Sequence, residues 1–192
     1  MCYRGYMDID DIHNRIDGLF RSFASDCDAP IRRVVCNEDV WYLRLGRRLG
    51  VYRADLTHTM LGGGVLAVPR GEVEYWSAKL AELRAGVLED LPARALLLHE
   101  AVHAEQMKGR SFWLWALRYV LSRRFRRRME REAYTLQLVY LARSGAALRA
   151  AEWIQHMRTL YCGAFGGDRA RRTFEEIAET VRRLVPDARI SD

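Results

Sequence analysis

Two histidines four residues apart are the feature of this chain most informative about chemistry. The stretch His99-Glu100-Ala101-Val102-His103 has the pattern H-E-x-x-H. Residues four apart stand one above the other on one face of an α-helix, so both imidazoles can bind a single zinc ion. Glu100 points about one step round the helix, where it can take a proton from a zinc-bound water. The motif therefore predicts a zinc-dependent hydrolase with His99 and His103 as ligands and Glu100 as general base.

This motif requires a helix, and the surrounding residues predict one from Pro92 to Lys108. Asp90 is a good N-cap, Pro92 suits the first turn, and no helix breaker occurs before Gly109. The leucines at 96–98 indicate that the helix lies in the core. The alternative is a chance match of the pattern on a buried helix, and this context makes it the weaker interpretation.

A catalytic zinc site needs a third protein ligand, with water in the fourth place. The predicted helix from Arg127 to Ser144 offers Glu130 and Glu132. On a helical wheel, the residues within about 40° of Glu130 suit the protein interior; they are Tyr134, Gln137 and Leu141. Arg143 falls beside Glu132, which indicates the solvent side. Because a carboxylate on the buried side needs a partner, we predict Glu130 as the ligand. Two surface carboxylates paired with arginines remain the alternative.

The two motifs together resemble those of the gluzincin metallopeptidases. The resemblance includes the heat-shock and CAAX-processing membrane proteases, their minimal soluble relatives (minigluzincins), and the ImmA/IrrE proteases. In the first group the second motif is E-x-x-A-D, whose first Glu binds zinc. Glu130 and Ala133 match it, whereas Tyr134 replaces the Asp that supports the site. In an ImmA/IrrE-like register the ligand would be Glu132.

The resemblance spans roughly Gly62 to Leu141 and implies a peptide or protein substrate. It places an edge strand above the active site, which Val65 to Val68 would form, to align an extended peptide by main-chain pairing. It also implies a donor for the oxyanion, for which Tyr134 is our prediction. Three further side chains remain candidates for that role, namely Tyr140, His58 and His156. Gln106, on the same face as His99, is expected either to contact substrate or water or to lie on the surface.

The order of the predicted elements indicates an α+β fold. We expect a small N-terminal mixed sheet, then a mostly helical bundle that carries the zinc helix, in a single zincin-like domain over residues 1–192. The predicted strands are Ile31 to Cys36, Val40 to Leu45, Val51 to Leu56 and Val65 to Val68. The other predicted helices are Asp10 to Phe23, Glu72 to Leu83, Phe112 to Leu121, Ala146 to Leu160 and a last one through Leu184. The tryptophans at 113, 115 and 153 are expected in the core.

The net charge of +6 comes largely from arginine clusters. One cluster is Arg123 to Arg128, and another consists of Arg44, Arg47 and Arg48. Such clusters can bind nucleic acid or acidic lipid. The favoured interpretation is a solvated helix end, where arginines suit the C-terminal dipole, because interleaved aromatic residues are missing. Nucleic acid is thus a less favoured partner, and nothing predicts the oligomeric state.

Other features of the sequence predict a cytoplasmic protein without a membrane span. No run of eighteen apolar residues occurs, and the N-terminus lacks the apolar stretch of a signal peptide. The four cysteines are therefore expected to be reduced, with a Cys27–Cys36 pair as the alternative. Two other functions remain open: a zinc protease acting at nucleic acid or on a regulator, and a non-catalytic, zinc-stabilised binding module.

Overall fold

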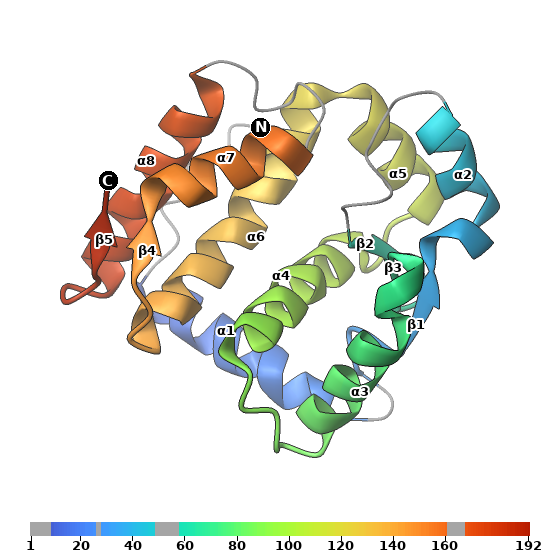
Figure 1. Cartoon of the computed structure of the whole chain (residues 1–192), viewed down its shortest axis with the longest axis horizontal. Helices are drawn as coiled ribbons and strands as arrows, with labels where there is room; N and C mark the ends of the chain where they lie inside the picture. Colours follow the sequence, from blue (N-terminus) through green and yellow to red (C-terminus); the bar gives the residue numbers. More distant parts are fainter. Residues whose placement is uncertain (1–8, 26–27, 49–57, 161–167) are drawn as a thin grey trace.

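The computed structural model describes residues 9–25, 28–48, 58–160 and 168–192. It confirms the α+β prediction, with a small mixed sheet on one side of a larger group of helices (Figure 1). The helices are α1 (Ile9–Phe23), α2 (Trp41–Arg48), α3 (Val73–Arg84), α4 (Leu91–Met107), α5 (Phe112–Leu121), α6 (Arg123–Arg143), α7 (Ala150–Leu160) and α8 (Arg169–Leu184). The strands are β1 (Arg33–Cys36), β2 (Thr59–Leu61), β3 (Val65–Val68), β4 (Leu148–Arg149) and β5 (Ile190–Ser191).

The first sheet has three strands in the order β1-β3-β2. Strand β3 runs parallel to β1 and antiparallel to β2, with Leu66 opposite both Val34 and Met60. The triple glycine forms the turn from β2 to β3, and Gly63 and Gly64 have φ angles of 74° and 75°. These left-handed conformations favour glycine and suit a tight hairpin turn.

The prediction that Val65 to Val68 forms an edge strand is wrong, because β3 lies between β1 and β2. All four of its residues are buried. A strand covered on both faces reads as a continuous apolar run, without the alternation of a half-exposed strand. The edge nearest the motif helix is β2, which packs against α4 (Figure 1).

The strand predicted from Val40 to Leu45 is also wrong, since this segment from Trp41 onward belongs to α2. A short 3-10 turn at Asn37–Asp39 redirects the chain after β1, and the amides of Leu43 and Arg44 then donate to the carbonyl of Val40. Leu43 is buried whereas Trp41 and Arg44 are exposed, so α2 contributes Leu43 to the core. The strand predicted from Val51 to Leu56 lies outside the described residues.

Helix α4 confirms the predicted motif helix and occupies the centre of the fold (Figure 1). Asp90 accepts a hydrogen bond from the Ala93 amide at 3.0 Å and caps the helix, and Pro92 lies in its first turn. Helices α1, α3 and α6 and strand β2 pack around it. Side chains of α4 and α6 therefore meet in the interior.

Helix α6 begins at Arg123, one turn earlier than predicted, and the Ser122 hydroxyl caps it by accepting from the Phe125 amide. The arginine run consequently forms the N-terminal turns of a helix. Our interpretation of these arginines as suiting a C-terminal dipole is therefore wrong, because the dipole at this end disfavours cations. The predicted helix from Ala146 also differs, since Leu148–Arg149 forms β4, which pairs with β5, and α7 begins at Ala150.

No helix among the described residues is long and apolar enough to cross a bilayer. Cys36 is a buried free thiol, so it takes part in no disulfide, and Cys27 lies outside the described residues.

Candidate metal centre

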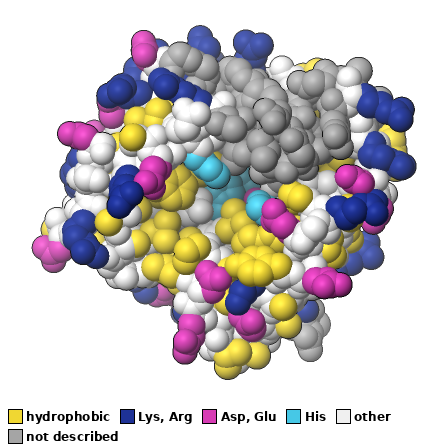
Figure 2. Space-filling view, viewed as in Figure 1, with side chains coloured by type: hydrophobic (Ala, Val, Ile, Leu, Met, Phe, Trp, Pro, Cys, Tyr) yellow, Lys and Arg dark blue, Asp and Glu magenta, His cyan; other side chains and the backbone are white. Residues whose placement is uncertain are grey.

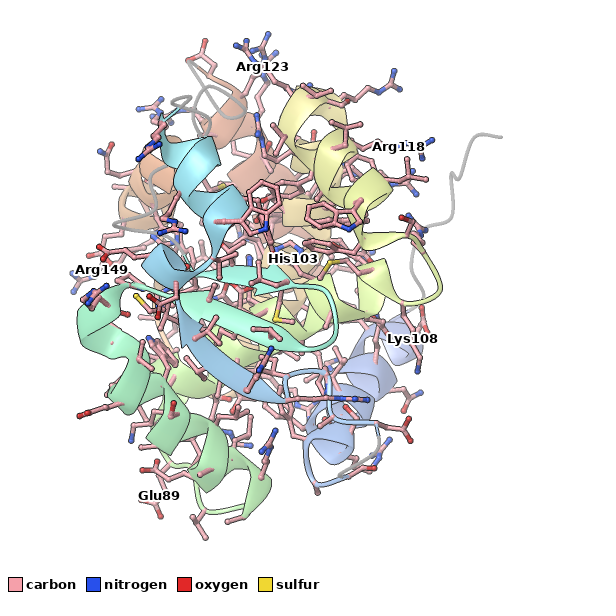
Figure 3. All side chains as sticks on the ribbon, turned by 90° about the vertical axis from the view of Figure 1, so that its right-hand side faces the viewer. Glu89, His103, Lys108, Arg118, Arg123 and Arg149 are labelled. Carbon is pink, nitrogen blue, oxygen red and sulfur yellow. The ribbon has the colours of Figure 1, made fainter. Side chains whose placement is uncertain are left out.

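The structure brings His99, His103 and Glu130 together in the interior. The two histidines lie one turn apart on α4, with their Nε2 atoms 3.2 Å from each other. Glu130 reaches across from α6, and its carboxylate oxygens lie 3.4 Å from His99 Nε2 and 3.3 Å from His103 Nε2. One ligand atom from each residue lies within 4.8 Å of the others, and all three residues are buried. Figure 3 shows His103 in the middle of the molecule.

Figure 2 shows histidine side chains at the bottom of a depression between hydrophobic side chains. The nitrogen and oxygen donors of the three residues match the ligands of catalytic zinc sites. Three protein ligands also leave a fourth position for water or substrate. The donor set therefore fits a catalytic zinc ion.

Two glutamines orient the histidines. Nδ1 of His99 donates to Oε1 of Gln137 at 2.9 Å, and Nδ1 of His103 donates to Oε1 of Gln106 at 2.9 Å. An amide oxygen only accepts hydrogen bonds, so it keeps the imidazole proton on Nδ1 and leaves Nε2 free to bind a metal. Gln137 thus supports the imidazole of His99 from α6.

Gln106 connects His103 to a carboxylate behind the site. Its amide nitrogen donates to the carbonyl of Met129 at 3.1 Å and to Glu132 Oε2 at 3.0 Å. Glu132 in turn accepts from Arg15 of α1 at 2.7 Å. Glu132 therefore lies outside the group of three ligand residues and acts on His103 through Gln106. The structure thus places Gln106 in a supporting role.

The predicted solvent-side position of Glu132 beside Arg143 is only partly right. Glu132 is half-buried because Arg15 covers it, and Arg15 also binds Glu105 at 2.7 Å. Arg143 binds Asp17 instead, at 2.9 Å. The helical wheel separated the two glutamates correctly, but it could not include the partner on α1.

Glu100 is buried next to the two histidines, and its Oε2 atom has no hydrogen-bond partner among the described residues. A buried carboxylate oxygen without a partner is costly, and such a group calls for an explanation. A water or substrate group held at the metal centre would supply the missing partner. This position suits a general base.

Tyr119 of α5 is a site residue that the sequence interpretation missed. Its hydroxyl donates to Oε1 of Glu130. Burial and the charge of Glu130 raise the pKa of Tyr119 well above its usual value, so the phenol remains a neutral donor. The only available signal was its spacing from Trp115, which stacks on it with ring centroids 4.9 Å apart.

The site stabilises positive charge. Burial alone would lower the pKa of His103, but the carboxylate of Glu130 outweighs burial and raises that pKa to about 9. Burial opposes ionisation of Glu130 in the same way, yet His103 and His99 hold the pKa of that carboxyl well below its usual range. A proton on His103 therefore places a positive charge beside the Glu130 carboxylate.

Tyr134, the predicted oxyanion donor, is buried with its ring against the His99 ring, at 4.7 Å between centroids. This contact holds the imidazole in place, and the role of Tyr134 as a donor to substrate stays a prediction. His156 of α7 is exposed, and its ring lies 6.0 Å from the Tyr134 ring.

The other two candidates contact residues outside the ligand group. His58 binds Glu72 at 2.9 Å and packs on the Trp76 ring. Tyr140 packs on Phe20 of α1. Neither contact involves a ligand residue.

Comparison of the chain with protein-family models, with curated proteins and with solved structures finds no match. The functional proposal therefore depends on the residues of the site itself.

Proposed function

We propose that this chain is a zinc-dependent metallopeptidase of gluzincin type. The observation that supports it most is the buried group of His99, His103 and Glu130 with the unpartnered carboxylate oxygen of Glu100 beside it. A chance H-E-x-x-H match would not require a third ligand from another helix, nor an acceptor for each imidazole Nδ1. The cytoplasmic location expected from the sequence stays a prediction.

The roles of the residues follow from their positions. His99, His103 and Glu130 would hold the zinc ion, which when bound lowers the pKa of water and polarises a carbonyl group. Glu100 would accept a proton at its free Oε2 and donate it to the leaving amine. Gln137 and Gln106 would keep both imidazoles in the tautomer that presents Nε2. Tyr119 would hold the carboxylate of Glu130.

A peptide substrate requires a strand edge if it is to be aligned by main-chain pairing. Because β3 is central, we assign this role to β2, whose residues Thr59–Leu61 pair only with β3 among the described residues and pack against α4. An extended peptide added to the free edge of β2 would lie along the motif helix.

The test combines metal analysis with a peptide-library cleavage assay on the wild type and on Glu100→Gln. We expect about one zinc per chain in both proteins, and loss of cleavage by several orders of magnitude in the variant. Glu100→Gln keeps the size of the side chain and leaves both imidazoles, so retained zinc would show that the site is intact. Unchanged turnover in the variant, or a protein that does not take up zinc, would overturn the proposal.

One observation favours a second candidate function, a non-catalytic module with a structural zinc. Tyr119 brings an additional oxygen to the ligand group, and a fourth protein ligand would close the site. In that case Tyr119→Phe would weaken zinc binding strongly and no peptide would be cleaved. In the peptidase, Tyr119→Phe leaves the three ligands in place and cleavage is detectable.

A further inference from the structure

Helix α5 and the adjoining Trp41 expose a group of large apolar side chains. Among the described residues, six of the eight exposed large hydrophobic side chains lie here. We call them the α5 surface, which consists of Trp41, Trp113, Leu114, Leu117, Val120 and Leu121. The prediction that Trp113 lies in the core is wrong, since it is 57% exposed. Its ring lies 6.2 Å from that of Trp41, so the surface continues from α5 to α2.

The apolar character of α5 extends around the helix. At about 100° per residue, its five members of the α5 surface fall within an arc of about 120°. The opposite side carries Trp115, which is buried, and Tyr119, which contacts Glu130. A helix that is apolar on both sides is normally enclosed by other elements. The described residues leave the outer, apolar side of α5 uncovered, which indicates a binding surface.

Exposed cationic side chains precede, interrupt and follow this apolar stretch along the chain. No Asp or Glu occurs between Met107 and Glu130. The exposed cations of this stretch are Lys108, Arg110, Arg118, Arg123, Arg124 and Arg128. Figure 3 shows Arg118 and Arg123 at one end of the molecule and Glu89 at the other. The first turn of α6 contains no acidic residue, although its N-terminal position disfavours arginines, so helix stability does not explain them.

A hollow that borders the α5 surface at Leu114 combines apolar and cationic side chains. It has a volume of about 210 Å³. Its lining consists of Arg110, Ser111, Leu114, Trp115, Arg118 and Phe125. The guanidinium groups of Arg110 and Arg118 could bind a phosphate group, while the apolar side chains beside them could contact a hydrocarbon chain attached to it.

We propose that the α5 surface docks on the surface of an anionic lipid bilayer. Its tryptophan and leucine side chains enter the boundary between headgroups and acyl chains, while the arginines bind lipid phosphates. A second copy of the chain fits the α5 surface less well than a bilayer does, because a symmetric contact would bring the arginines of both copies together. Nucleic acid also fits the α5 surface less well, since leucine and valine side chains do not stack on bases. The inference is independent of the proposed peptidase activity.

The test is flotation of the purified full chain with vesicles of phosphatidylcholine alone or mixed with phosphatidylglycerol. We expect binding to the anionic vesicles only, and weaker binding at high salt. Leu114→Gln and the pair Arg118→Gln/Arg123→Gln should each lower binding, the arginine pair by about tenfold or more. None of these residues belongs to the metal centre.

The chain offers matched controls for both changes. Val87 is 64% exposed, as is Leu114, and it lies two residues from Glu89 at the opposite end of the molecule. The pair Arg171→Gln/Arg172→Gln on α8 removes the same charge from exposed positions on another side (Figure 1). Val87→Gln and the α8 pair should leave binding within about twofold of the wild type.

Four outcomes would overturn the proposal. These are absence of binding to anionic vesicles, equal losses in the α5 and control variants, a Leu114-dependent dimer in sedimentation without vesicle binding, and arginine-dependent binding to DNA without vesicle binding. Equal losses would indicate general attraction by the net charge. The dimer and the DNA complex would assign the α5 surface to a second copy or to nucleic acid.

Discussion

The α4–α6 interface and the α5 surface depart from the usual distribution of residues in opposite directions. Between α4 and α6 the protein buries two histidines, two glutamates and a glutamine, whereas on α5 it exposes tryptophan, leucine and valine to water. Buried polar groups and exposed apolar patches are the two observations that call for an explanation, since scattered exposed apolar residues are normal.

The two regions differ in how many of their side chains contact other residues of the chain. In the interface, His99 and His103 each have an amide oxygen at Nδ1, and Tyr119 donates to Oε1 of Glu130, whereas Oε2 of Glu130 and Oε2 of Glu100 have no hydrogen-bond partner among the described residues. On the α5 surface, the described chain covers only the inner side of the helix. Side chains of the chain itself thus position the groups of the interface, which could hold a small cation, whereas the exposed side chains of α5 have no such partners among the described residues.

The largest expected effect is a loss of stability, which should differ between a leucine in the α4–α6 interface and a leucine on the α5 surface. Leu97 of α4 is fully buried, whereas Leu114 is 64% exposed. Leu97→Ala should lower the free energy of unfolding by about 2–5 kcal/mol, because it leaves a cavity in the core. Leu114→Ala should change it by less than about 0.5 kcal/mol. Urea denaturation measures both, and a large loss for Leu114→Ala would mean that the α5 surface stabilises the fold instead of awaiting a partner.

The second prediction separates the two glutamates of α6. Glu130→Gln removes a charged oxygen ligand and should weaken zinc binding by about a hundredfold or more, on the order of 2.7 kcal/mol. Glu132→Gln should cost less, because Glu132 acts only through Gln106. Competition with a chromophoric chelator measures both affinities. The reverse order would assign the ligand to Glu132 and support the ImmA/IrrE-like register.

The third prediction concerns the amide that supports His99. Gln137→Leu removes the acceptor for Nδ1 and should weaken zinc binding by about tenfold, whereas Gln137→Glu should retain it because a carboxylate also accepts. Thr135→Val, another buried polar residue of α6, serves as the control, since its hydroxyl bonds only the carbonyl of Arg131 among the described contacts. Equal affinities in Gln137→Leu and the wild type would show that His99 needs no such support.

Much of the candidate site could be predicted because helical periodicity is a local property. The spacing within α4 aligns His99 and His103, and the wheel of α6 places Glu130 on the buried side. The structure brings these three residues together as expected. The same reasoning could not assign roles to Gln137, Tyr119 or Arg15, because each depends on which segments pack side by side.

The sheet shows where local patterns fail. Val40 to Leu45 and Val65 to Val68 are both short apolar runs, yet the first belongs to a helix and the second is a central strand. Such runs carry too few residues to distinguish periods of 3.6 and 2. The position of β3 between two partners depends on pairing with segments that its own sequence does not specify. Predictions of element type were therefore best for the long helices.

The smallest expected effect is a change of stability with pH, caused by the proton that His103 binds in the folded protein. In the metal-free protein the pKa of His103 is raised from 6.5 to about 9, although burial opposes this, because the Glu130 carboxylate lies beside it. The folded state therefore binds a proton that the unfolded state releases between these values. Its contribution to stability is fully present below about pH 6.5 and is lost as the pH rises toward 9.

Urea denaturation of the metal-free protein across this pH range tests the effect, and zinc affinity should rise over the same interval because zinc competes with the proton. Glu130→Gln provides the control, since a neutral amide no longer raises the pKa of His103 and the loss of stability at alkaline pH should be smaller. If the wild type and Glu130→Gln lose stability equally, another group is responsible, and His103 is not charged inside the metal-free site. The interface would then tolerate its buried polar groups without a cation, and its difference from the α5 surface would be one of packing alone.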